Sequence, residues 1–194
     1  MKNTLTIIIL VLLGILCMQG CSKYNTFVSY DEDVEKAWSD VETQYQRRAD
    51  LIPNLVNTVK GYADFEKNTF IEVTEARSKA TSINISADDL TEENLRRFQE
   101  AQSQLTGSLS RLLATFERYP ELKANRGFLD LQKQLEGTEN RITTARRDYN
   151  GVVTEYNKTV RKFPSNFYAS IFGFDKRPQF EADAGAENAP KVEF

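Results

Sequence analysis

The feature that most constrains this chain is a regular apolar stripe between residues 128 and 163. Apolar residues recur there at steps of three and four, at Phe128, Leu131, Leu135, Ile142, Ala145, Tyr149, Val152, Tyr156, Val160 and Phe163. This spacing places them on one side of a single helix that is about 50 Å long at a rise of ~1.5 Å per residue. A stripe of that length cannot bury itself, so the helix needs partner helices of similar length.

Two further stretches carry apolar residues at helical spacing. The first spans residues 34–62, where Arg48 occupies a position that the pattern reserves for an apolar residue. Its apolar members are Val34, Trp38, Val41, Tyr45, Ile52, Leu55, Val59 and Tyr62. The other ends before Pro120 and consists of Leu95, Phe98, Leu105, Leu109, Leu112, Phe116 and Tyr119. A narrower stripe of small residues lies between the two, within residues 65–80.

Helices that are apolar on one side, separated by polar turn residues, are typical of a bundle. The chain has only nine glycines, and charged residues make up 27% of it, a composition that suits long helices. We therefore predict an all-α fold, an antiparallel up-and-down four-helix bundle with long helices and no β-sheet, over residues 30–163. We expect the first of these helices to begin at a capping box formed by Ser29 and Glu32.

The absence of histidine limits the chemistry that this chain performs. It removes Ser-His-Asp and Cys-His activation of a nucleophile, almost every zinc site, and the Glu-x-x-His pairs of di-iron bundles. The net charge is −3, and the arginine pairs are scattered among acids, which argues against nucleic-acid binding. We expect no catalytic residue, no metal site and no cofactor.

The N-terminus reads as a membrane-targeting segment. A basic Lys2 precedes an apolar run of fourteen residues from Leu5 to Met18, which is short for a membrane span of about 20 residues and typical of a signal peptide. Gly20 and Cys21 then resemble the lipobox of bacterial lipoproteins, although the two residues before Gly20 depart from its usual pattern. We predict a signal peptide at residues 1–20, a lipid on Cys21 and a polar tether at residues 21–29. The alternative is an uncleaved anchor, and both tether the chain to a membrane.

The C-terminal residues divide into an aromatic segment and a polar tail. Pro164 ends the long helix, and residues 164–182 contain several aromatic side chains, among them Phe167, Tyr168 and Phe172. We expect this segment to pack on an open end of the bundle, the alternative being that it touches lipid or a partner protein. Residues 183–194 are rich in Ala, Glu and Asn and are predicted to be a disordered tail.

Polar residues on the apolar sides of the helices are the only unusual chemistry. An arginine drawn into a bundle must be paired, because an unpaired buried charge costs several kcal/mol. We expect Glu117 or Glu139 to pair with Arg48 or Arg146. The candidates for a buried polar network, or for a site that binds a partner, are Arg48, Asp50, Asn54, Glu117, Glu139, Arg146, Asn150 and Asn157. A buried polar network of these residues would fix how the helices align.

Several of these positions fall in runs that resemble the LemA family of bacterial envelope proteins. The matching runs include Ala37–Trp38, Arg47–Val56, Val59–Tyr62, Tyr119–Asn125, Glu139–Ile142, Ala145–Arg147 and Phe163–Pro164. The resemblance covers residues 24–180 and implies a four-helix bundle on an N-terminal membrane anchor. No enzymatic activity is established for that family. Many members keep a longer anchor, so Cys21 is a departure that favours a lipoprotein.

These observations favour a membrane-tethered, non-enzymatic scaffold or interaction module in the bacterial cell envelope, with another envelope protein as its partner. The alternative is a binding module for a lipid, peptide or small molecule, which needs a cavity of ~300 Å³ or more between helices, near Pro53 or under the aromatic segment. A hydrolase with a carboxylate or metal site would need at least three acidic side chains that converge on one point.

Overall fold

The computed structural model describes residues 2–60, 67–116 and 118–182. Its elements are α1 (Lys2–Lys60), α2 (Lys67–Ser82), the 3₁₀ helix η1 (Ala87–Asp89), α3 (Glu92–Phe116), α4 (Pro120–Lys123), α5 (Arg126–Arg161) and α6 (Ser165–Phe172). No strand occurs in these ranges, so the predicted all-α class is confirmed. Tyr62, Glu117 and the predicted disordered tail, residues 183–194, lie outside the described residues.

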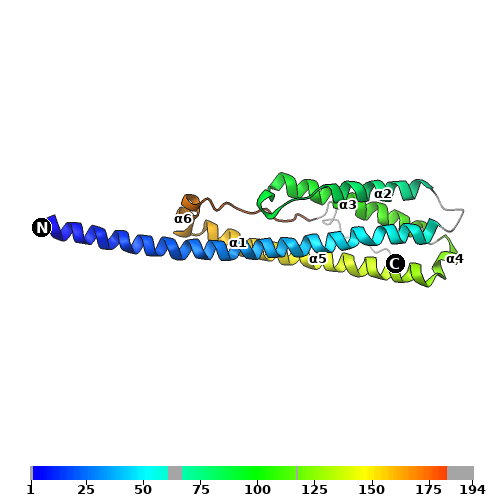
Figure 1. Cartoon of the computed structure of the whole chain (residues 1–194), viewed down its shortest axis with the longest axis horizontal. Coiled ribbons are helices and arrows are strands. Elements are labelled where there is room, and N and C mark those ends of the chain that lie inside the picture. The colour runs from blue at the N-terminus through cyan, green and yellow to red at the C-terminus, as the bar shows by residue number, and fades with distance from the viewer. Residues whose placement is uncertain (1, 61–66, 117, 183–194) are drawn as a thin grey trace, which may run out of the picture.

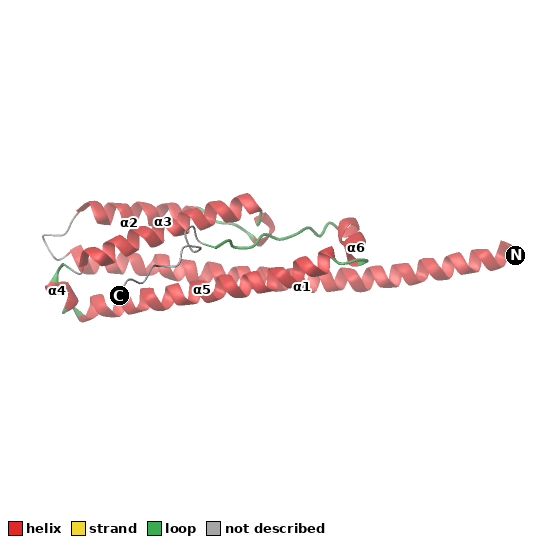
Figure 2. Ribbon diagram, turned by 180° about the vertical axis from the view of Figure 1, so that it is seen from behind, coloured by secondary structure: helices red, strands yellow, loops and turns green. Residues whose placement is uncertain are grey.

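The other helices are arranged along α1. Figure 1 shows α5 beside the second half of α1, with α2 and α3 next to each other over that pair and α4 at the end far from the N-terminus. Figure 2 shows the first part of α1 projecting beyond all other helices. Of the described helices, α1 alone is long and apolar enough to cross a membrane by length and composition, and the apolar side chains near its start are exposed.

The apolar stripes meet in two core clusters. The cluster nearer the N-terminal half of α1 contains Trp38, Phe98 and Tyr149, and the cluster nearer α4 contains Leu55, Leu112 and Phe128. The described apolar members of the stripe at residues 34–62 are all buried, and Arg48 in their midst is buried too. Thr138 fills the gap in the α5 stripe and is fully buried. The helical spacing therefore identified the core-facing side of each helix.

The secondary structure of residues 21–29 differs from the one expected from the sequence. These residues were expected to form a polar tether, but α1 runs through them without interruption. Phe27 is fully buried, and its ring lies 5.2 Å from that of Phe174. The helix persists here because the C-terminal residues cover one side of it, and this packing outweighs the polar composition.

The end of α5 also differs from the expected stripe. The helix begins where the Asn125 side chain accepts a hydrogen bond from the N–H of Phe128 (3.2 Å), and it ends at Arg161. Lys162 already has an extended backbone, so Phe163 leaves the helical register. Its side chain is 88% exposed rather than buried. The last residue assigned to the stripe is therefore free to contact something other than the bundle.

Candidate functional site

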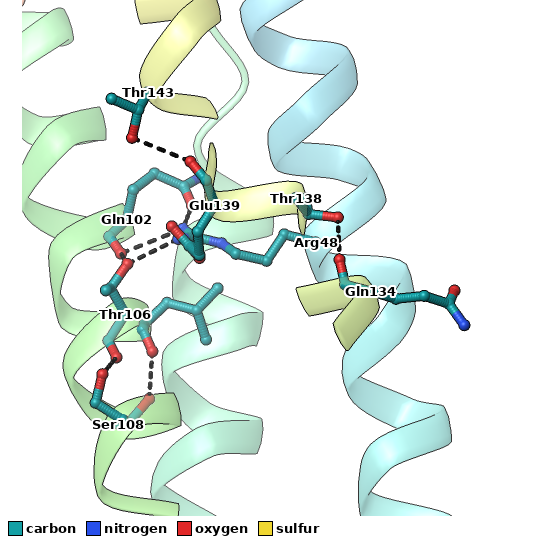
Figure 3. A network of polar contacts seen from close by, with 10 residues as sticks. Arg48, Gln102, Thr106, Ser108, Gln134, Thr138, Glu139 and Thr143 are labelled. Carbon is teal, nitrogen blue, oxygen red and sulfur yellow. Dashed lines mark hydrogen bonds and ion pairs between the residues drawn. The ribbon is translucent and has the colours of Figure 1, made fainter. Parts of the chain in front are cut away.

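Arg48 forms the most unusual polar site in the described part of the chain. Its position within the apolar stripe of α1 directs the guanidinium into the core, where the side chain is 1% exposed. Its Nη1 lies 2.7 Å from Oε1 of Glu139 on α5 (Figure 3). The Glu139 side chain is 39% exposed, so the carboxylate reaches both the arginine and the surface. The predicted pairing of Arg48 with Glu139 is confirmed.

Residues of α3 complete the contacts of the arginine. Nη1 also donates to the Thr106 hydroxyl at 2.7 Å, and Nη2 donates to the side-chain oxygen of Gln102 at 2.5 Å and to its carbonyl at 3.3 Å. The guanidinium lies over the ring of Tyr45, 5.1 Å from its centroid. Arg48 Nε is buried without a hydrogen-bond partner among the described residues. The Arg48 site (Arg48, Gln102, Thr106 and Glu139) thus joins α1, α3 and α5 through side chains.

Neighbouring hydroxyl groups contribute to this region without adding charge. The Thr138 hydroxyl donates to the carbonyl of Gln134 at 2.7 Å, and Ser108 donates to the carbonyl of Leu105 at 2.9 Å (Figure 3). Bonds of this kind to the preceding turn satisfy a buried hydroxyl within its own helix. The arginine and its carboxylate partner therefore provide the charge at this level of the bundle.

A groove lies beside the Arg48 site. It has a volume of about 830 Å³ and is lined by residues of α1, the end of α2, α3 and Gln134 of α5. Asp50 and Asn54, both candidates from the sequence, line it, but they belong to no network with Arg48. Asp50 accepts from Gln46 at 2.8 Å, and the Asn54 carbonyl accepts from Thr58 at 2.9 Å. Burial raises the pKa of Glu42, another lining residue, although a hydrogen bond with Trp38 opposes that rise.

A second polar region occupies the other half of α5 and binds the residues that follow α6. We call residues 173–182 the strap. Asn157 donates to the carbonyl of Arg177 and accepts from its N–H, at 2.9 and 3.0 Å. Asn150 makes the same reciprocal pair with Phe180, both at 2.9 Å. Each asparagine thus binds the extended strap backbone as a neighbouring strand would.

Aromatic residues add to this attachment. The hydroxyls of Tyr156 and Tyr149 donate to the carbonyls of Asp175 and Pro178, at 2.9 and 3.0 Å. Phe180 is buried, with its ring 5.4 Å from that of Tyr149. Burial raises the pKa of the Tyr156 hydroxyl to about 12, with Asp31 adding to the rise and Arg177 opposing it. Both tyrosines therefore stay protonated, as donors to the strap, at neutral pH.

Two arginines make further contacts that hold the strap. Arg177 pairs with Asp31 of α1, with Nη2 3.0 Å from Oδ1, and its Nη1 donates to the carbonyl of Ala87 at 2.8 Å. Arg146 donates to the carbonyl of Glu181 at 3.0 Å, and its guanidinium lies 4.9 Å from the centroid of the Phe180 ring. The strap therefore connects α5 with α1 and η1.

The candidates from the sequence consequently fall into separate groups. Arg48 and Glu139 form the Arg48 site, whereas Arg146, Asn150 and Asn157 bind the strap. Gln102 and Thr106 were missed. Gln102 lies in the gap of six residues between Phe98 and Leu105, and that gap in the stripe was a usable signal. Among the described residues no three His, Cys, Asp or Glu side chains gather as metal ligands would.

Comparison with known proteins places these features in a wider group. A family model described as the LemA family matches residues 37–194, a range that includes Arg48, all of α5 and the strap. Magnetosome protein MamQ 2 of Paramagnetospirillum magneticum is 29% identical over 187 residues, covering 88% of this chain and 68% of that protein. Protein LemA of Metamycoplasma hominis is 25% identical over 157 residues, covering 81% and 68% respectively. Magnetosome protein MamQ of Magnetospirillum gryphiswaldense is 25% identical over 187 residues, with 88% and 68% covered.

Proposed function

This chain belongs to the LemA family, and from that premise we propose that it is a non-enzymatic scaffold of the bacterial cell envelope. It is tethered to a membrane at its N-terminus, through a lipid on Cys21, with the helical bundle outside the cytoplasm. The bundle presents its long polar surfaces to an envelope protein. The proposal concerns attachment and presentation rather than a chemical reaction.

The continuity of α1 is the observation that carries this proposal. One helix runs from Cys21 into both core clusters without a break, so an anchor at this residue is joined to the bundle by continuous helix. Contacts with α5 and α6 accompany it along much of this length (Figure 1). A helix supported in this way transmits position and orientation from the membrane to the bundle, which is what a scaffold requires.

The polar residues of the core support a structural role. Each contact of Arg48, Asn150 and Asn157 described above joins elements that are distant in the chain. The Glu139 carboxylate is engaged by Arg48. Such networks specify how helices align.

The lipid attachment is tested by metabolic labelling with a palmitate analogue. Cys21→Ala should abolish the label, whereas Cys17→Ala, a change at an exposed cysteine four residues earlier, should leave it unchanged. Equal labelling of both variants would contradict lipidation at Cys21. The scaffold role is tested by crosslinking in the native cell, which should recover the same envelope protein in independent preparations. Recovery of nothing above background would contradict it.

The groove beside the Arg48 site supports a second candidate function, the binding of a lipid, peptide or small molecule. Its volume of about 830 Å³ is within the usual range for ligand sites, and both apolar residues such as Phe98 and polar residues such as Gln46 line it. Native mass spectrometry of the purified chain should then detect a bound molecule. Thr43→Trp, which fills the groove, should remove that molecule, and Asp40→Trp, on α1 but off the groove, should not. A chain that carries no added mass contradicts this candidate.

A further inference from the structure

Helix α6 has two different apolar sides. Its inner side consists of Ser165, Tyr168 and Ala169, which are buried against the bundle. Its outer side carries Phe167 and Ile171, four residues apart in the helix, and Phe163 lies in the turn that precedes it. The side chains of Phe163, Phe167 and Ile171 are 88%, 63% and 61% exposed. A row of large apolar side chains that faces away from the bundle is not needed for the packing of α6.

The position of this row is fixed by contacts of α6 with α1. A Cβ placed on Gly20 would lie 3.5 Å from the Tyr168 ring, and the rings of Tyr24 and Phe172 are 5.2 Å apart. The outer row therefore lies at the level of residues 20–24, directly after the exposed apolar run that ends at Met18. Figure 2 shows α6 where α1 leaves the bundle. The outer row and the exposed apolar part of α1 are therefore adjacent along the length of the molecule.

Basic residues flank the row in the sequence. Within residues 20–26 and 161–176 the charged side chains are Lys23, Arg161, Lys162 and Lys176, with Asp175 as the one acid. Arg161, Lys162 and Lys176 are exposed. Apolar and aromatic side chains bordered by lysine and arginine are typical of helices that lie in a membrane interface, where the cations meet anionic headgroups.

We propose that the outer side of α6 is inserted into the headgroup region of the same bilayer that holds the N-terminus. The protein then contacts the membrane at two places, α6 and the region of Cys21, and the bundle is fixed in its tilt and rotation relative to the membrane plane. A single anchor would leave the bundle free to rotate about α1. The contact is available whether the N-terminal helix is retained or is replaced by a lipid on Cys21, because α6 lies beside that residue.

The test uses the full chain reconstituted into vesicles of phosphatidylcholine and phosphatidylglycerol. Phe167→Trp reports on α6, and Ile71→Trp on α2 is the matched control, since Ile71 is also an exposed apolar residue. The emission of the native Trp38 is subtracted with the unsubstituted chain. Brominated phospholipids quench tryptophan at close range. Phe167→Trp should lose most of its emission, more with bromine near the glycerol than near the acyl terminus, while Ile71→Trp should keep its emission.

Three results would overturn the proposal or separate it from its premise. The inference rests on the proposed membrane tether, so flotation with the vesicles is measured first, and a chain that does not float contradicts the tether itself. A chain that floats while Phe167→Trp is unquenched by brominated lipid and open to aqueous acrylamide contradicts only the α6 contact. A tryptophan shielded from both quenchers shows that a second copy of the chain covers α6, which also contradicts it. Ile171→Trp provides a second reporter if Phe167→Trp changes the far-ultraviolet dichroism.

The role of the basic residues is tested separately. Replacing Lys162 and Lys176 with Gln should reduce the quenching of Phe167→Trp on vesicles that contain phosphatidylglycerol and leave it unchanged on phosphatidylcholine alone. Equal quenching of parent and variant on both kinds of vesicle would overturn the electrostatic part of the proposal.

Discussion

The Arg48 site and the strap are both built on polar side chains of α5, yet they hold the molecule together in different ways. At the Arg48 site one buried charge is shared by side chains of three helices. At the strap the amides of Asn150 and Asn157 pair with an extended backbone, and the ion pair of Arg177 with Asp31 is one contact among several. Loss of one partner at the Arg48 site therefore affects the whole site. The strap is held by several separate bonds, so loss of one leaves the others in place.

This difference indicates how the apolar side of the long α1–α5 pair can be covered along its length. Figure 1 shows α2 and α3 over only part of the α1–α5 pair, and the strap runs between α6 and that part. An extended segment has unpaired backbone groups, which must find partners when they are buried. Asparagine and tyrosine side chains on α5 supply these partners, so a non-helical segment completes the core beside Trp38 through Phe180.

The largest predicted effect separates the two regions most clearly. Glu139→Ala removes the carboxylate that balances Arg48 and should lower the free energy of unfolding by about 3 kcal/mol, the low end for a broken buried pair because Glu139 is partly exposed. Glu136→Ala, an exposed acid on the same helix, is the control and should change it by less than about 0.5 kcal/mol. Urea unfolding of the full chain measures both, and equal effects would contradict the special role of Glu139.

A smaller and more local effect is expected at the strap. Asn150→Ala removes two hydrogen bonds to Phe180 and should cost about 2 kcal/mol. The amide of Phe180 should then exchange with solvent much faster, while amides near Arg48 keep their protection. Asn140→Ala, on the exposed side of α5, is the control. Loss of protection throughout the bundle would show that the strap and the Arg48 site are not separable.

The smallest effect depends on pH. Tyr156→Phe removes one hydrogen bond to the strap and should cost about 1 kcal/mol at neutral pH. The pKa of Tyr156 rises from its ordinary value of 10.0 to about 12 in the folded chain, mainly through burial. The folded state therefore holds this proton more tightly than the unfolded state does, and stability falls as the pH rises from about 10 toward 12. The variant should show a shallower fall over that range, and an unchanged slope would contradict this assignment.

The sequence predicted the Arg48 site better than the strap, for a physical reason. A polar residue in a helical stripe must face the core, so Arg48 and its need for a carboxylate could be inferred from spacing alone. The same spacing placed Asn150 and Asn157 on the inward side of α5 but could not show what lay opposite. The strap has no periodic pattern, and the pairing of Arg177 with Asp31 joins residues 146 positions apart.

The helix through residues 22–29 was missed for a different reason. Residues 22–29 were interpreted by their polar composition, although Tyr24 and Phe27 continue the spacing that leads to Val34 and Trp38. Their partners, Phe172 and Phe174, lie close to the other end of the described chain. A local sequence window does not contain the residues that stabilise this part of α1, even though the stripe itself extends into it.

The central claim is that α1 is one continuous helix from the anchor region at Cys21 into the core. Amide hydrogen exchange of residues 22–29, in the full chain reconstituted in a bilayer, tests it most directly. These amides should exchange slowly, at rates comparable with those of the buried segment around Trp38, because their hydrogen bonds belong to a packed helix. Exchange at the rate of an unstructured peptide would contradict the claim, and with it the proposal that α1 transmits orientation from the membrane to the bundle.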